Sequence, residues 1–585
     1  MRLISWRLSV PFLLVIAMVA VACSSSDEGT ATPAPTTPAA SATATVATPA
    51  ATEDQDQTLR VNLGGEPQSL DPQRATDVTS ITVLRQLYAT LLRVDENQAI
   101  QPDLASEVPT IENGGISADG LVYTFKLRPD LKWDDGTPLV AQNFVDGAKR
   151  LFEPGSGNYY VDFYRVLAAA GKNDEVVKAL GEGKEGPEVE ALEAEVAANL
   201  EVEAPDATTV VYHLSRQSPV FLLLATMWPL YPVRQDIVDA KGDTWTEAGT
   251  LVSNGPFMLK EWKHTESITL EKNPNYYRAA DVVLQTITMD MIADTAIEYL
   301  AYQNDELDVI ALGPEELVQV RADKALQEEF SAYAQLSTLG VYFNIADESL
   351  SDVKVRQALT GAFDRDEYAE TVREGAVLPA YGWVPPGMPG HDPEVGLQYK
   401  DAVDKAKQLL VDAGYAGGAG LSIEILSADS SVSQLTAEWL KEQWEKNLGV
   451  TVTINTLERA TYFAERNAGK FQVTSGGWGA DYPDPQNWMP LFRTGGGLNS
   501  GNFSNAEFDK LIDAADIELN NEKRIDLYRQ AQVIMIEEAP FAPLYYGRRN
   551  VLVKPWVQGL TTSSMESGIP GDLFFDRLKI VGRSN

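Results

Sequence analysis

Hydrophobic and polar positions follow an alternating pattern in the first half of the chain. In residues 121–128, LVYTFKLR, large apolar side chains occupy every second position, which predicts a half-buried strand. Residues 208–214, TTVVYHL, predict a second strand. The Ala- and Glu-rich stretch between them, broken by glycines, predicts a surface insertion with helical pieces.

The second half alternates between the helical and the strand pattern. Residues 351–375 show one apolar helical face, with Ser351 or Asp352 placed to cap the helix and Gly375 to end it. The segments that follow predict helices at 401–414, 433–449 and 459–469 and strands at 421–427, 450–458 and 471–478. This alternation predicts an α/β fold in which helices cover both faces of a parallel sheet.

The amino-terminal segment predicts export. Arg2 and Arg7 precede an apolar run, residues 10–22, that is too short to span a bilayer, so residues 1–22 predict a secretory signal peptide. The run ends in AVAC, which resembles a lipobox, and Cys23 is the only cysteine of the chain. Lipid on Cys23 would hold the protein at the extracytoplasmic side of a membrane, at an outer surface or in a periplasm; an incidental cysteine after a plain signal is the alternative. Few large apolar side chains follow, so residues 24–57 predict a disordered tether.

Composition excludes some classes of function. The net charge of −37 argues against nucleic acid as a partner, because phosphate binding needs a basic surface. The three histidines form no metal-binding HExxH motif, and the sequence contains no GxSxG nucleophile motif. A glycosidase with a pair of acids stays open as an alternative, although nothing singles out such a pair. We therefore expect no enzyme, no metal and no cofactor.

The stretch GGWGADYPDPQNW, residues 476–488, places Asp481 among aromatic residues after a predicted strand. Ligands of open α/β sheets bind at such strand ends. A carboxylate in apolar surroundings needs a cation. That cation comes either from a ligand or from a lysine or arginine of the same chain, in which case Asp481 belongs to a structural turn. We expect Asp484 to be a turn residue.

Several motifs occur in the order of a known family. They are GGEPQSLDP (64–72), TFKLRPDLKWDDGTPL (124–139), VSNGPFMLKEW (252–262), DVKVRQALTGAFDRD (352–366), GWGADYPDP (477–485) and LVKPW (552–556). Together they resemble the family 5 extracellular solute-binding proteins, the oligopeptide- and dipeptide-binding proteins of bacterial ABC importers. The resemblance implies a class II periplasmic-binding-protein-like fold with two lobes and a hinge. Three domains are expected: domain I at 58–79, 230–337 and 546–585, domain II at 80–229, and domain III at 338–545.

The resemblance also implies a function and a site. A monomeric protein would capture an extended peptide between its lobes and deliver it to the transmembrane subunits of an ABC permease. Asp481 would bind the peptide's amino group. The other positions that match the family's binding site are Trp478, Gly479, Tyr482, Glu66, Tyr160, Tyr545 and Tyr546.

Two points stay open at the level of sequence. Ser475 stands where a family member has arginine, so no residue is assigned to the ligand's carboxylate. The same fold could carry an oligosaccharide, a metal complex or an opine, and a structural adhesin is a further alternative.

Overall fold

The computed structural model describes residues 56–153, 160–167, 175–176 and 186–583. They belong to one compact unit, Ala51–Asn585. The predicted signal peptide, Cys23 and nearly all of the tether lie outside the described residues. Within those ranges, no helix combines the length and the apolar character that a membrane span requires.

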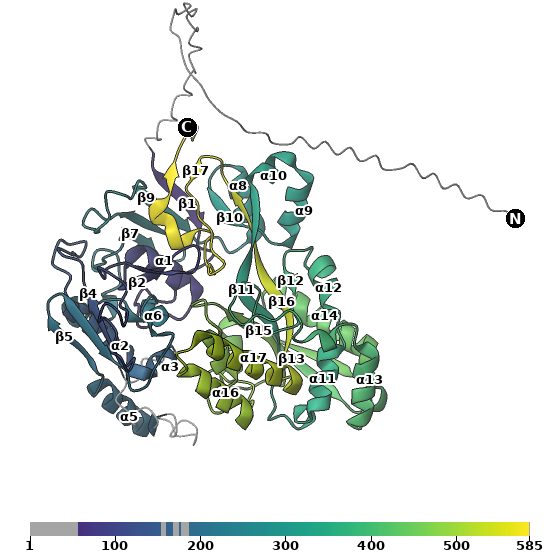
Figure 1. Cartoon of the computed structure of the whole chain (residues 1–585). Helices are drawn as coiled ribbons and strands as arrows, with labels where there is room; N and C mark the ends of the chain where they lie inside the picture. Colours follow the sequence, from purple (N-terminus) through teal and green to yellow (C-terminus); the bar gives the residue numbers. More distant parts are fainter. Residues whose placement is uncertain (1–55, 154–159, 168–174, 177–185, 584–585) are drawn as a thin grey trace, which may run out of the picture. The chain divides into compact units, whose positions relative to one another are not determined.

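An 11-stranded mixed sheet organises the described residues (Figure 1). Its strand order is β14-β13-β15-β11-β16-β10-β1-β9-β8-β7, and β12 pairs with β16. The strands are β1 Thr58–Asn62, β7 Phe257–Lys263, β8 Ser267–Lys272, β9 Thr286–Asp290, β10 Val309–Ala311, β11 Phe330–Phe343, β12 Leu378–Pro379, β13 Ser422–Ala428, β14 Thr451–Leu457, β15 Val473–Gly479 and β16 Phe541–Val553.

Two long antiparallel strands, β11 and β16, connect the two ends of this sheet (Figure 1). At one end, β16 pairs with β10, which leads to β1 and β9. At the other end, β11 pairs with β15, which leads to β13 and β14. The strands β13, β14 and β15 are parallel as predicted. The antiparallel β11 and β16 were not predicted, and they make the sheet mixed.

Helices cover both faces of the β13–β14–β15 end, as the alternating pattern predicted. Val341 and Phe343 of β11 join a core with α11, α13 and α14, and Tyr342 between them joins the core on the other face, with α16 and α17. These helices are α11 Val353–Gly361, α13 Val403–Asp412, α14 Ser431–Leu448, α16 Ala506–Asp516 and α17 Asn521–Glu538.

The single helix predicted over 351–375 was wrong in its extent. Asp352 caps α11 as predicted, but α11 ends at Gly361. Asp364 then caps a new segment by accepting a hydrogen bond from the backbone of Glu367. A short Asp side chain satisfies free N–H groups at a helix start, so it interrupts a longer helix here.

The remaining elements belong to several cores, of which one large core includes β1 and α1. The strands predicted at 121–128 and 208–214 are confirmed as β4 and β6, which pair in a small sheet. These elements are α1 Val78–Leu87, β2 Leu92–Val94, β3 Ile100–Pro102, β4 Val122–Lys126, α2 Ala141–Leu151, α3 Val161–Tyr164, α5 Pro187–Ala198, β5 Val202–Asp206, β6 Thr209–His213, α6 Phe221–Leu224, α7 Gln235–Lys241, α8 Thr295–Gln303, α9 Pro314–Ala322, α10 Lys324–Glu329, α12 Arg365–Glu367, α15 Arg459–Asn467, β17 Val557–Gln558 and β18 Lys579–Ile580.

Candidate ligand-binding site

Strand β15 has an open edge in its second half. It pairs with β11 along its whole length, from Phe343 opposite Val473 to Ser337 opposite Gly479. On its other side it pairs with β13 only at Val473 and Thr474. In the part of the chain that the structure describes, residues 475–479 therefore have a strand partner on one side only.

The register shows which backbone groups face this open edge. The amide of Ala480 donates to the carbonyl of Leu336 opposite it, at 2.8 Å. In an antiparallel pair the bonded positions alternate, so Trp478 bonds to β11 while Gly477 and Gly479 direct their N–H and C=O groups away from β11. Of the two predicted residues of β15, Gly479 thus has backbone groups free to pair with a ligand, as has Gly477, whereas the backbone of Trp478 is bonded to β11.

Asp481 follows this edge and is held by neutral hydrogen-bond donors. The hydroxyl of Tyr160 donates to Asp481 Oδ1 at 2.9 Å, and the side-chain amide of Asn487 donates to Oδ2 at 3.0 Å. Asn487 also accepts from the Asp481 backbone amide at 2.9 Å. Among the described residues, no lysine or arginine forms an ion pair with Asp481; Arg85, whose charge acts on it, pairs with Asp572 instead, at 3.3 Å.

The surroundings of Asp481 disfavour its charged form. Burial raises the pKa of Asp481 to about 6, although the hydrogen bonds from Asn487 and Tyr160 and the charge of Arg85 act in the opposite direction. Because the Asp481 carboxylate is removed from water without a cation beside it, a ligand that brings a cation should gain the most binding free energy there.

Asp484, in the same turn, has a cation of its own. Both of its oxygens accept from the guanidinium of Arg524, at 2.7 and 2.6 Å, and both side chains are buried. Its Oδ1 also caps the short helix that follows, by accepting from the Gln486 amide. The expectation of a structural role for Asp484 is confirmed.

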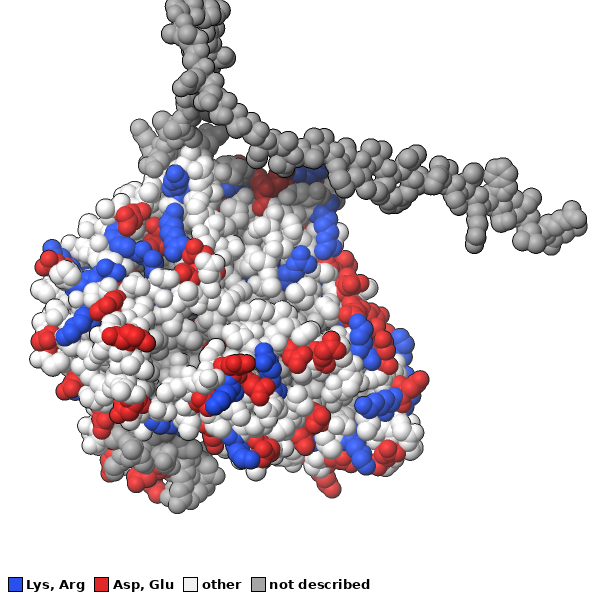
Figure 2. Space-filling view, viewed as in Figure 1, with Lys and Arg blue, Asp and Glu red and all other residues white. Residues whose placement is uncertain are grey.

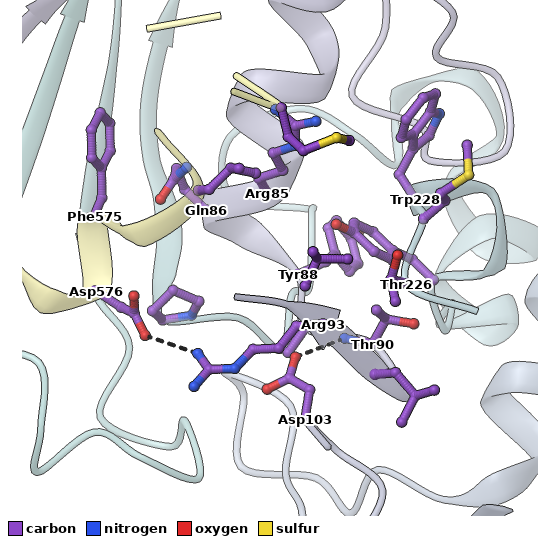
Figure 3. Close-up of a pocket in the computed structure, with 18 of the residues that line it drawn as sticks. Arg85, Gln86, Tyr88, Thr90, Arg93, Asp103, Thr226, Trp228, Phe575 and Asp576 are labelled. Atoms are coloured by element: carbon purple, nitrogen blue, oxygen red, sulfur yellow. Dashed lines mark hydrogen bonds and ion pairs between the residues drawn. The ribbon is translucent and has the colours of Figure 1, made fainter. Parts of the chain in front are cut away.

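Asp481 lines a cavity of about 130 Å³ (Figure 3). The walls come from the end of α1, from β2 and from the segments around 226–231, 276–278 and 565–576. The wall is partly aromatic, with Trp228 and Phe575, and partly charged, with Arg93, Asp103 and Asp576 labelled in Figure 3. Such a mixed lining suits a polar ligand more than an apolar one.

Two further predicted tyrosines lie near Asp481. Tyr160 contacts the carboxylate directly and packs edge-on against Trp228, with ring centroids 4.7 Å apart. Tyr482 is fully buried: its ring packs against Phe163 and its hydroxyl donates to Gln486. Tyr482 does not line the cavity. Although it is next to Asp481 in the chain, its contacts in this structure are packing contacts.

The three remaining predicted residues lie apart from this cavity. Glu66 accepts from the amide of Thr265 and contacts His264 Nδ1, both at 2.7 Å. Tyr545 and Tyr546 are mostly buried in β16; the ring of Tyr545 stacks on Tyr368, and the Tyr546 hydroxyl bonds to the Gly382 backbone. Their part in ligand binding stays a prediction.

Arg466, at the end of α15, was not predicted as a site residue. Its guanidinium carbon lies 3.1 Å from the position of a Cβ on Gly476, and it stacks over the Tyr342 ring at 5.0 Å. Within the described ranges it forms no ion pair, and its Nε is buried without an acceptor. A basic residue in the last turn of a helix is common, so no specific signal in the sequence points to Arg466.

Comparisons with known proteins agree with the predicted fold class. The model of the bacterial extracellular solute-binding proteins, family 5 middle, matches residues 99–500. The chain is 31% identical over 511 residues to the periplasmic oligopeptide-binding protein OppA of Escherichia coli K12, covering 86% of this chain and 90% of OppA. It is also 31% identical over 508 residues to the probable deoxycholate-binding periplasmic protein YgiS of the same organism, with 86% and 90% covered.

A solved structure matches nearly the whole chain. The murein tripeptide binding protein MppA of Escherichia coli aligns with a TM-score of 0.78 and 29% identity, over 91% of this chain and all of MppA. The mixed sheet with its two connecting strands and these matches confirm the two-lobed class II fold. The chain belongs to the bacterial extracellular solute-binding proteins of family 5.

Proposed function

We propose that this protein captures peptides with a free amino terminus outside the cytoplasm and delivers them to the permease of an ABC importer. The observation that carries the proposal is Asp481, a desolvated carboxylate without a cation among the described residues. A peptide's α-ammonium is a compact cation that forms charge-assisted hydrogen bonds with a carboxylate. Tyr160 and Asn487 hold the carboxylate in place for it.

The open edge of β15 supplies the second part of the proposal. An extended peptide can add to this edge and pair with the outward backbone groups of Gly477 and Gly479. Every peptide offers the same backbone groups, so this mode binds many sequences. With its amine at Asp481, the peptide runs antiparallel to β15, toward Ser475.

Arg466 is our candidate for the carboxylate at the far end of the peptide. It lies beside Gly476, five positions before Asp481 on the chain. A strand advances about 3.3 Å per residue, so this span corresponds to an extended peptide of roughly four to six residues. Arg466 would bind the ligand's carboxylate, which the neutral Ser475 cannot pair with.

The two sides of the site come from distant parts of the chain. Tyr160 and Asp481 are 321 positions apart. A ligand that touches both segments stabilises the closed arrangement of the lobes, and we propose that the permease recognises this closed form. No chemical step is required of the protein.

A non-peptide solute is the second candidate. This candidate is supported by the similarity to YgiS, which is described as a probable deoxycholate-binding protein and is as similar to this chain as OppA is. The uncompensated carboxylate of Asp481 favours a ligand that carries a positive group, which an oligosaccharide lacks.

Calorimetric titration of the purified protein tests the proposal. A pentapeptide with a free amine should bind at least about 100-fold more tightly than its N-acetylated form, because loss of a buried charge partner costs several kcal/mol. Asp481→Asn should abolish this difference, whereas Asp404→Asn, at a fully exposed position of α13, should keep it. Amidation of the carboxyl terminus should weaken binding through Arg466. Equal binding of free and acetylated peptides by the wild-type protein would remove Asp481 from the site.

A further inference from the structure

The cavity beside Asp481 contains two charged side chains whose hydrogen-bonding capacity is only partly used. They are Arg93, in β2, and Asp103, directly after β3. The strands β2 and β3 pair with each other, Arg93 opposite Gln101, so both side chains come from one small two-stranded unit. Figure 3 shows them on the same wall of the cavity.

Arg93 is partly exposed, and its buried Nε has no acceptor among the described residues. Its closest ionic partner is Asp576 Oδ2, at 3.9 Å, which is too long for a hydrogen bond. That oxygen already accepts from Arg278 at 2.7 Å. In the described part of the chain, the Arg93 guanidinium donates no hydrogen bond, and its Nε is buried without a partner.

Asp103 is an acceptor with unused capacity. Its Oδ1 accepts from the hydroxyl of Tyr277 at 2.7 Å, but among the described residues Oδ2 accepts only from the backbone amide of Thr90, at 3.3 Å. The residue is 6% exposed, and no lysine or arginine of the described chain pairs with it. A carboxylate oxygen has two acceptor positions, so Oδ2 can accept a further donor.

The charges around the cavity balance once the ligand's amine is present. An ammonium bound to Asp481 neutralises that carboxylate. The three guanidiniums of Arg85, Arg93 and Arg278 are then matched by three carboxylates. These carboxylates are Asp103 and Asp576, which line the cavity, and Asp572, which pairs with Arg85. A further charge from the ligand would stay unpaired in a desolvated place, which is costly.

We propose that this cavity selects a carboxamide side chain, asparagine or glutamine, at the first residue of the bound peptide. The carboxamide oxygen accepts from Arg93, and its NH₂ group donates to Asp103. Leucine has a similar shape but leaves both groups unsatisfied, and aspartate satisfies Arg93 but repels Asp103. This inference rests on the proposed function, because it assumes that the peptide's amine lies at Asp481.

The test is calorimetric titration, at pH 7, of four pentapeptides X-Ala-Ala-Ala-Ala in which X is Asn, Gln, Leu or Asp. The Asn or the Gln peptide should bind at least about tenfold more tightly than the Leu and Asp peptides, since hydrogen bonds to charged groups are stronger than those between neutral groups. Arg93→Met should bring the Asn and Leu affinities close together. Arg321→Met, at an exposed position of α9, should leave the preference unchanged.

Asp103→Asn provides a second variant with the same shape. Without the negative charge of Asp103, the positive charge of Arg93 is no longer offset. A ligand carboxylate can then supply the missing negative charge, so the preferred first residue should change from Asn to Asp. Equal affinities of the wild-type protein for the Asn, Leu and Asp peptides would overturn the inference, as would an unchanged preference in both variants. That result differs from failure of the proposed function, in which free and acetylated peptides bind equally or not at all.

Discussion

Asp481 and Asp484 lie in one turn, but their surroundings differ in whether a cationic side chain is present. Asp484 is enclosed with Arg524, which donates to both of its oxygens. Within the described ranges, Asp481 accepts hydrogen bonds from the neutral donors of Tyr160 and Asn487 and pairs with no lysine or arginine. Loss of Arg524 would leave the buried Asp484 without a counter-charge, which destabilises the fold, whereas a cationic ligand offsets the desolvation cost of Asp481. Asp484 therefore has a structural role, and we propose a binding role for Asp481.

At this scale we expect a specific pH dependence of peptide binding. The pKa of Asp481 is raised to about 6 in the free protein, and the ligand's ammonium binds the charged form. Affinity should thus fall about tenfold per pH unit below this pKa, and again above roughly pH 8, where the α-amine loses its proton. Titrations from pH 4.5 to 9 measure the profile. A flat profile between pH 5 and 7 would contradict the assignment.

The same shift gives a prediction for stability without ligand. Because the folded pKa lies above the ordinary value of 3.8, the charged form costs folding free energy, at most about 3 kcal/mol, at pH values above 6. Asp481→Asn should therefore unfold at the same or a higher urea concentration than the wild type at pH 7.5. A clear loss of stability in this variant would show that the carboxylate is structurally required.

At the scale of the elements, glycines allow β11 and β15 to approach each other closely. A Cβ at Gly477 would lie 2.1 Å from the carbonyl oxygen of Thr338 on β11. Real Cβ atoms do not approach an oxygen this closely, so any side chain here displaces one of the two strands. The open edge that we assign to the ligand depends on this pairing, because it sets the direction of the Gly477 and Gly479 backbone groups.

Gly477→Ala should therefore destabilise the protein by about 2 kcal/mol or more and weaken peptide binding at the same time. Gly479→Ala is the matched control for stability, since the nearest atom to its Cβ is 3.9 Å away. Urea unfolding with titration of the same peptide measures both effects. Equal stability of the two variants would show that β11 and β15 tolerate a wider separation.

At the scale of the whole molecule, the predicted lipid on Cys23 and the peptide site lie in separate parts of the chain. The site is built from residues of the compact unit Ala51–Asn585. Cys23 and most of the tether lie outside the described residues, and their function stays a prediction. A long polar linker transmits little force, so anchoring and binding should be independent.

Replacement of the predicted lipid attachment site tests this separation. In bacteria that express the full chain, Cys23→Ala should move the protein from the membrane fraction to the soluble fraction. The affinity for peptide should remain that of the wild type. Fractionation with immunoblotting and titration of the released protein measure the two effects. Retention of the variant in the membrane fraction would argue against lipid attachment at this cysteine.

Local patterns predicted the secondary structure of the second half well. The strands expected at 421–427 and 450–458 and the helix at 433–449 correspond to β13, β14 and α14. Such elements are encoded by side-chain periods of two and 3.6 within a short window, so neighbouring residues determine them. The end of α11 before Asp364 was not predicted, because the apolar face of the pattern continues past this point and only the cap at Asp364 interrupts the helix.

The sequence by itself determined the local elements, and its motifs, through family likeness, pointed to Asp481 as a binding residue. Only the tertiary structure decided that Arg524 belongs to Asp484, 40 positions earlier, and that no described cation reaches Asp481. The structure alone placed Arg466 beside Gly476 and brought Arg93 and Asp103 into the cavity. The physical reason is that charge pairing and open strand edges depend on contacts between distant segments, and these contacts leave no periodic signal in the chain.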